Sequence, residues 1–264
     1  MRRFWSSALL AVLLAAPAIC AAQQSKFQVL AFYSEHTEPD HVEFGKQAAQ
    51  FLRALAKKDD FALQTSTNFE DMQLDKPRQY QLVLWLNDLP STPAARKAFE
   101  QYMDSGGRWL GFHIAGYNDE STHWPWFVSF LGGAVFESNS WPPLPAKLDV
   151  EDRTSPVTSG LPTSFVSPAN EWYIWKPNPR ANPQVKVLLS LAKSNYPLGW
   201  KDTLVSGDLP VVWTNTRYRM LYINMGHGDK IFTSNVQNRL FENAILWLAA
   251  EKPRRSSSAS GHKP

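Results

Sequence analysis

The feature that most restricts the fold is a series of short apolar runs in the first half of the chain. Four of these runs are predicted to be buried strands: residues 27–33, 61–67, 81–86 and 108–112. Residues 41–58 repeat apolar side chains at helical spacing. A second helix is predicted up to Asp104, because Ser91 or Thr92 can cap it and Pro93 suits its first turn. Strands that alternate with helices predict a parallel sheet with right-handed crossovers.

Polar side chains follow three of the predicted strands, at Ser34, Glu35 and His36, at Asn87 and Asp88, and at His113. The carboxyl ends of parallel strands share one edge of a sheet, and ligands of open α/β sheets bind there. Ala115 and Gly116 follow His113 and are small enough for a tight turn. A histidine at this place either takes part in chemistry or only holds the next loop by a hydrogen bond. The strand pattern leaves both interpretations open.

The second half of the chain adds strands and one helix. Residues 147–150 and 185–191 are predicted strands, and residues 209–213 and 219–225 are a predicted hairpin. Residues 236–250 have the apolar spacing of a helix. No internal repeat or linker interrupts the 264-residue chain, so we expect one domain. We set its bounds at residues 23–251.

The first 22 residues have the pattern of a secretory signal peptide. Arg2 and Arg3 give a basic start, residues 8–16 are apolar, and Ala21 and Ala22 offer small residues for cleavage. The apolar run is too short to span a bilayer. We therefore expect a periplasmic or secreted protein that begins near Gln23 and does not span the membrane once the signal is removed. An uncleaved anchor is the alternative.

Charge and cysteine content exclude several classes of function. Two of the 27 Lys and Arg residues lie in the signal, and four lie in residues 252–264, a Ser-rich segment predicted to be a disordered basic tail. The remaining 21 basic residues are outnumbered by 24 acidic ones, and this excess of negative charge argues against a nucleic-acid surface. Cys20 is the only cysteine and lies in the signal, so the mature chain has no disulfide, thiolate nucleophile or cysteine-bound metal.

Several short pieces follow one another in a characteristic order: residues 106–113, 123–126, 131–133, 148–152, 155–156, 160–162, 171–173, 209–213 and 222–227. In this order and spacing the chain resembles the ThuA-like family, named for trehalose utilisation, over about residues 27–250. The resemblance implies an α/β fold of the class I glutamine amidotransferase-like type, a flavodoxin-like three-layer sandwich with a mostly parallel sheet. It also implies a small-molecule carbohydrate as partner. The implied role is in disaccharide catabolism, in some cases with keto-sugar intermediates.

Amidotransferases of that fold have a cysteine nucleophile where the resemblance places His113. Without cysteine, glutamine hydrolysis through a thioester is excluded. The chain also departs from the family at three places. Asn170 stands where members often have Asp, residues 138–142 lack a histidine, and Thr214 and Asn215 replace a pair that often includes His or Glu.

His113, His227 and Glu171 are the candidate catalytic residues. Both histidines end predicted strands, and glycines close to them let the backbone approach a ligand. Two imidazoles and a carboxylate can act as general base, general acid and orienting group. The same three could instead hold a divalent metal with an open position, or be structural. Their spacing matches no local metal motif, and the sequence requires no cofactor.

Six further side chains are candidates for substrate binding: His36, Asp88, Trp124, Trp126, Tyr173 and Trp213. Aromatic rings pack on the C–H faces of sugars, and a few placed polar groups fix the hydroxyls. The alternatives are a solvated loop for His36, a helix cap for Asp88 and core packing for the rings. Two functions therefore remain: an enzyme that acts on a glycoside or sugar derivative through His113, His227 and Glu171, or a carbohydrate-binding or accessory protein without catalysis.

Overall fold

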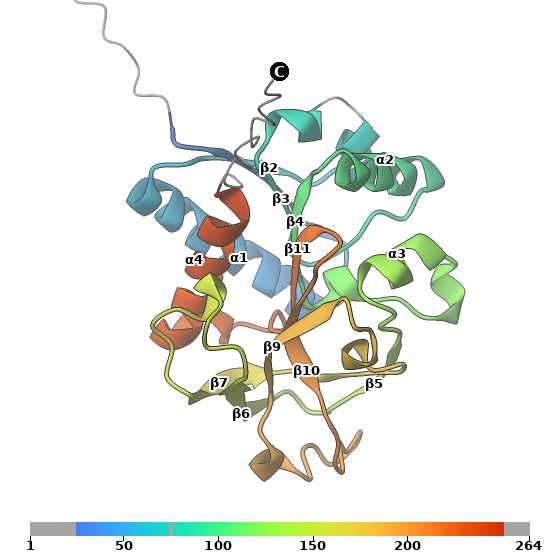
Figure 1. The fold of residues 1–264 in the computed structure, drawn as a ribbon, viewed down its shortest axis with the longest axis vertical. Helices are drawn as coiled ribbons and strands as arrows, with labels where there is room; N and C mark the ends of the chain where they lie inside the picture. The colour runs from blue at the N-terminus through green and yellow to red at the C-terminus, as the bar shows by residue number, and fades with distance from the viewer. Residues whose placement is uncertain (1–24, 74–75, 251–264) are drawn as a thin grey trace, which may run out of the picture.

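The computed structural model describes residues 25–73 and 76–250, which form an α/β fold around one nine-stranded sheet (Figure 1). The strand order is β2-β1-β3-β4-β11-β10-β9-β6-β7. The predicted signal peptide and basic tail lie outside the described residues. None of the helices among the described residues has the length and apolar character needed to cross a membrane.

One half of the sheet is parallel. Its strands are β1 (Gln28–Phe32), β2 (Ala62–Ser66), β3 (Leu82–Trp85), β4 (Arg108–Phe112) and β11 (Arg219–Ile223). β1 pairs in parallel with β2 and β3, and β4 pairs in parallel with β3 and β11. The parallel arrangement predicted for the first four strands is confirmed, and their carboxyl ends share one edge.

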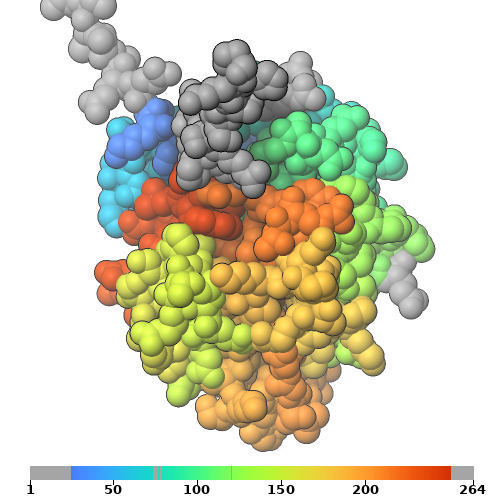
Figure 2. Space-filling view, viewed as in Figure 1, coloured from blue at the N-terminus to red at the C-terminus, as the bar shows by residue number. Residues whose placement is uncertain are grey.

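The other half of the sheet is antiparallel. It contains β10 (Pro210–Asn215), β9 (Val185–Leu191), β6 (Leu144–Val150) and β7 (Ser164–Asn170). The predicted hairpin is confirmed, with Trp213 opposite Tyr222 in the β10–β11 pair. The sheet is therefore mixed, because the hairpin reverses the chain direction and every strand beyond it pairs antiparallel. In the space-filling view the yellow to light-orange residues of this half lie below the blue and green ones (Figure 2).

Four α-helices cover the two faces of the sheet: α1 (Pro39–Asp59), α2 (Pro93–Asp104), α3 (Pro125–Phe130) and α4 (Asn235–Ala249). α1 and α4 pack on one face and α2 and α3 on the other (Figure 1). The sheet and its helices form two hydrophobic cores, the first on the side of α1 and α4 and the second on the side of α2 and α3. Successive strand residues point to opposite faces, so Val29 belongs to the first core and Leu30 to the second. Thr92 caps α2 by accepting from the Ala95 amide, and Pro93 lies in the first turn, as predicted.

The remaining regular elements are short. β5 (Phe136–Asn139) and β8 (Tyr173–Trp175) form a separate antiparallel pair. The connections contain 3-10 helices at Phe69–Gln73, Lys76–Gln79, His113–Gly116, Glu120–Thr122, Pro156–Thr158, Pro179–Ala181, Lys193–Asn195 and Ile231–Thr233. The pair of β5 with β8 matters for the site, because it places residues 139 and 171 beside the sheet edge where His113 lies.

Candidate functional site

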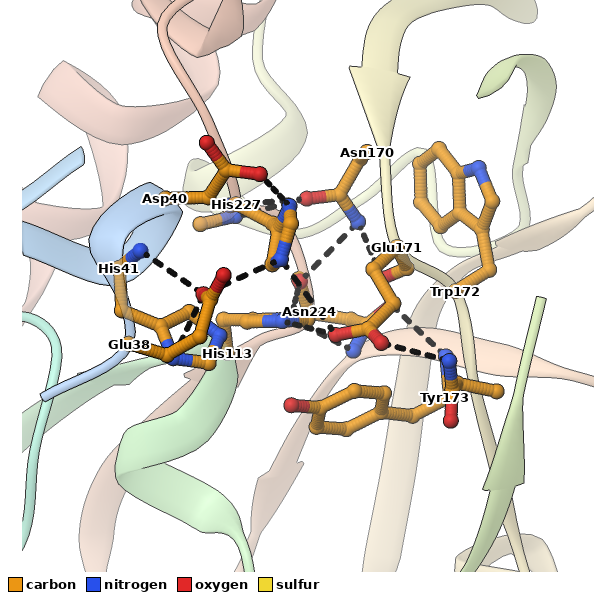
Figure 3. A network of polar contacts seen from close by, with 12 residues as sticks. Glu38, Asp40, His41, His113, Asn170, Glu171, Trp172, Tyr173, Asn224 and His227 are labelled. Atoms are coloured by element: carbon orange, nitrogen blue, oxygen red, sulfur yellow. Dashed lines mark hydrogen bonds and ion pairs between the residues drawn. The ribbon is translucent and has the colours of Figure 1, made fainter. Parts of the chain in front are cut away.

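Three histidines and a glutamate meet at the carboxyl edge of the parallel strands (Figure 3). His113 follows β4 directly, and His227 lies in the loop after β11. His41 lies in the first turn of α1, and Glu171 lies between β7 and β8. The ring centroids of the three histidines are 5.0–5.5 Å apart. The predicted meeting of His113 and His227 in one place is therefore found in the structure.

His113 is held rigidly from both sides. Its imidazole is fully buried, and its backbone is in the left-handed region at φ +46°. The Nδ1 atom is 2.8 Å from the carbonyl oxygen of Asn224, and the Tyr222 hydroxyl donates to the His113 carbonyl at 2.9 Å. A carbonyl can only accept, so Nδ1 carries the hydrogen. The Nε2 lone pair of a neutral His113 therefore points toward Glu171.

The contact between His113 and Glu171 contains one proton. His113 Nε2 lies 3.1 Å from Glu171 Oε2, and a bare Nε2 and a carboxylate oxygen are both acceptors. Burial and nearby His227 hold the pKa of His113 well below its ordinary value. Burial raises the pKa of Glu171, although His227 and His41 oppose the rise. A neutral imidazole therefore faces a carboxyl group whose pKa is raised, and these two acceptors form a hydrogen bond only when a proton lies on Glu171 or between the two atoms.

His41 and His227 complete the cluster. Both are buried, and burial with the neighbouring His113 and His227 lowers the pKa of His41 to about 3. Among the described residues, neither nitrogen of His41 has a hydrogen-bond partner, and nor does Nδ1 of His227. Carboxylates lie at longer range: Glu38 Oε2 is 3.5 Å from His227 Nε2, and Asp40 Oδ2 is 3.8 Å from His227 Nδ1.

Two sets of three side chains in this cluster could hold a metal ion. Glu38, His41 and His227 offer ligand atoms within 4.8 Å of one another, and so do His41, His113 and Glu171. His41 belongs to both sets, so its imidazole lies near Glu38 as well as near the His113–Glu171 pair. A cluster of this kind can move protons, bind a cation, or do both.

The family model for trehalose utilisation, ThuA, matches residues 28–248. The chain belongs to the ThuA family. The crystal structure of a ThuA-like protein from Bacteroides uniformis ATCC 8492 is 50% identical to it, with a TM-score of 0.84, and the match covers 89% of this chain and 95% of that one. No curated protein matches the sequence. The family indicates a role in carbohydrate metabolism.

Two more distant structures share only the fold with this ThuA-family chain. A ThuA-like protein from Parabacteroides merdae ATCC 43184 is 16% identical, with a TM-score of 0.61, over 86% of this chain and 93% of that one. The β-galactosidase from Bacillus circulans sp. alkalophilus is 11% identical, with a TM-score of 0.52, over 85% of this chain and 31% of that one. At these identities the likeness extends to the fold alone.

Asn170, one of the departures from the ThuA family pattern, orders the site. Its Oδ1 accepts from the backbone amides of Gly226 and His227 at 3.0 and 3.1 Å. Its Nδ2 donates to the Glu171 carbonyl at 2.7 Å and to the Asn224 carbonyl at 3.3 Å. An aspartate could not make the last two bonds, because an ionised carboxylate only accepts. The amide therefore ties together the two loops that bring Glu171 and His227 to the edge.

The other two departures have different places in the structure. Residues 138–142 lack a histidine but supply Asn139, whose Nδ2 donates to Glu171 Oε1 at 2.5 Å. Thr214 donates to the Met220 carbonyl, and Asn215 donates to the Phe130 carbonyl. Thr214 and Asn215 thus satisfy local backbone groups.

The six predicted substrate-binding residues fall into three places. Tyr173 lies on His113, with ring centroids 4.2 Å apart. His36 is exposed, and Asp88 is half-buried and accepts from the Leu89 amide, while burial raises its pKa. Trp124, Trp126 and Trp213 pack in or against the second core, between other aromatic rings. Tyr173 is therefore the predicted binding residue that the structure brings against the imidazoles.

Sequence reasoning missed His41, Glu38 and Asp40. His41 marked only the start of the predicted helix at residues 41–58. The place of His41 in the chain could have identified it, because the helix that follows β1 begins at the sheet edge where His113 lies. Trp141 also lies at the site, edge-on to His227 with centroids 6.3 Å apart.

A separate cavity of about 1020 Å³ lies at β6 and β9, away from the cluster. Arg180 on its wall pairs with Glu151 at 2.7 Å and with Asp208 at 2.5 Å. These three charges satisfy one another, whereas among the described residues both nitrogens of His41 and Nδ1 of His227 lack a hydrogen-bond partner. Three unpaired imidazole nitrogens gathered in one cluster at the carboxyl edge of the parallel strands need an explanation, so we place the functional site at the histidine cluster.

Proposed function

We propose that this ThuA-family protein is an enzyme that acts on a glycoside or keto-sugar derivative by proton transfer at the His113–Glu171 pair. The observation that carries the proposal is the 3.1 Å contact between His113 Nε2 and Glu171 Oε2, which holds one proton at the carboxyl edge of the sheet. General acid–base catalysis needs a proton placed on a group that can reach the substrate.

Burial supports different roles for the two members of the pair. The His113 side chain is fully enclosed, whereas that of Glu171 is 13% exposed. Glu171 is therefore the group that would contact a sugar oxygen, and His113 would hold the proton and orient the carboxyl group. Asn139 fixes the other oxygen of Glu171, and the partly exposed ring of Trp141 offers a flat apolar surface next to His227. Aromatic rings with a few placed polar groups suit a sugar.

The position of the cluster supports the same proposal. We infer from the strand order β2-β1-β3-β4-β11 that the parallel half is flavodoxin-like. In such sheets ligands bind beyond the carboxyl ends of the strands, near the point where the strand order reverses. Here that point lies between β1 and β3, and His41 lies in the first turn of α1, the helix after β1.

A screen of wild-type protein against glycosides and keto-glycosides tests the proposal. We expect turnover of at least one member of such a panel, measured by product release, and a raised unfolding midpoint in its presence. A sugar that raises the midpoint without being turned over would favour the carbohydrate-binding alternative. If the protein neither turned over nor bound any sugar of the panel, both functions would be contradicted.

We also propose that the protein is periplasmic or secreted, on the strength of the basic and apolar pattern of residues 1–22. Mass spectrometry of protein isolated from its native host should then give a mature chain that begins near Gln23. An intact Met1 in the cytosolic fraction would contradict this proposal.

A further inference from the structure

Glu38, His41 and His227 form a set of ligand atoms beside the proposed acid–base pair (Figure 3). Glu38 Oε2 lies 3.5 Å from His41 Nδ1 and 3.5 Å from His227 Nε2. Two atoms bound to one zinc-like cation at tetrahedral angles are separated by about 3.4 Å, since each bond is about 2.0–2.1 Å long. Both distances are therefore close to those that a shared cation would set.

The buried nitrogens of this set point to a ligand. The His41 residue is 5% exposed, and neither of its nitrogens has a hydrogen-bond partner among the described residues. Leaving such groups buried and unpaired destabilises a protein. A neutral imidazole is the form that binds metals, through the lone pair of one ring nitrogen. The arrangement thus supplies lone pairs in a fixed place without a proton donor to satisfy them.

We propose that Glu38, His41 and His227 bind one divalent transition-metal ion with at least one open coordination position. Two imidazoles and one carboxylate are a known ligand set for open zinc sites and for non-haem iron(II) sites. Magnesium and calcium prefer sets made of oxygen atoms. The proposal is therefore specific to ions such as Zn²⁺ or Fe²⁺.

The surroundings of the set fit this assignment. Asp40 Oδ2 lies 3.8 Å from His227 Nδ1, on the side of the ring away from Glu38. A carboxylate beside the second nitrogen of a ligating histidine commonly orients the ring. The Gly228 amide donates to the Asp40 carbonyl at 3.1 Å, so the loop after β11 is tied to the start of α1. The Glu38 side chain is 47% exposed, which leaves the set open to solvent.

The proposed ion would lie next to the acid–base pair. Glu171 Oε2 is 3.9 Å from His227 Nε2. An open coordination position there would hold a carbonyl or hydroxyl oxygen of a sugar beside the carboxyl group of Glu171. This role in turnover rests on the proposed function, whereas binding of the ion does not.

Titration of the untagged, chelator-treated full chain with Zn²⁺ tests the assignment. Calorimetry should give one saturable equivalent, and Co²⁺ should give a visible absorption band when it takes the same place. Glu38→Gln should weaken Zn²⁺ binding by about 100-fold or more. Even residues that only hydrogen-bond to a metal ligand change the metal affinity by about 10- to 100-fold. Glu38 is partly exposed, so this variant should fold, and His41→Ala gives a second variant.

Glu35→Gln is the matched control, because it removes the same charge from an exposed position three residues away. It should leave the affinity unchanged, and Mg²⁺ should not compete. Absence of saturable Zn²⁺ binding, or binding that is equally strong in Glu38→Gln, would overturn the proposal. A greater loss of affinity in Glu171→Gln than in Glu38→Gln would also overturn it, because the ion would then lie on the other set. Zn²⁺ binding without sugar turnover would leave this proposal standing and remove the proposed function.

Discussion

Glu171→Gln is expected to lower the kcat/KM for the sugar that wild type turns over by about 10²- to 10⁴-fold, the range for loss of a general acid or base. Glutamine keeps the size of the side chain, and its amide can donate to His113 Nε2 where the shared proton now lies. The contact and the fold are therefore preserved, while the group that exchanges a proton with the substrate is lost.

The measurement combines steady-state kinetics with a thermal melt of the same preparation. Glu137→Gln is the matched control, since Glu137 lies on β5 and forms an exposed ion pair with Lys176. Exposed pairs contribute little, so both the activity and the midpoint of this control should stay near those of wild type. If Glu171→Gln kept more than about a tenth of wild-type activity, Glu171 would not be the proton-transfer group.

Trp213→Ala is expected to reduce the free energy of unfolding by about 3–5 kcal/mol, the usual range for removing a large buried aromatic ring. Trp213 is fully buried between Trp175 and Tyr222, and its Nε1 donates to the Leu131 carbonyl at 3.0 Å. For a chain of this size the thermal midpoint should fall by roughly 10 °C, because each kcal/mol shifts it by about 2–4 °C.

Trp200→Ala is the control for this loss, because Trp200 is 75% exposed. A substitution away from the core usually changes stability by less than about 0.5 kcal/mol. The comparison separates two roles for Trp213, which the sequence suggested as a sugar-binding ring. Weakened sugar binding with an unchanged midpoint would place Trp213 in the binding surface and contradict its role in the core.

Asn224 and Asn170 show why single residues of the site cannot be ranked from sequence. The Asn224 carbonyl accepts a hydrogen bond from His113 Nδ1. The Asn170 amide links that carbonyl to the loop of His227 by two further hydrogen bonds. Neither is a candidate by residue type. Asn224 acts through its backbone carbonyl and Asn170 through its side-chain amide, and each joins segments that are far apart in the chain, at separations of 111 and 57 residues.

The sequence by itself determined the parallel half of the sheet and its functional edge. Runs such as residues 27–33 and 81–86 have no polar face, so they must be covered on both sides, and the helices between them impose parallel strands. Parallel strands place their carboxyl ends together, which brought His113 to the edge. The family resemblance added His227 and Glu171 to the same pocket. Local signals also predicted a cap at Ser91 or Thr92, which the structure places at Thr92, and the hairpin of β10 and β11.

Only the tertiary structure decided which side chains of the edge meet. His41 lies in the first turn of an amphipathic helix, so its position on the buried side is consistent with ordinary helix patterning. Its contact with His113 and His227 depends on how α1 packs against the sheet. The same holds for Trp124, Trp126 and Trp213, because a ring that packs in a core and a ring that binds a sugar look alike in a sequence. Burial and hydrogen-bond direction, which fix the proton of His113, arise only when distant segments pack together.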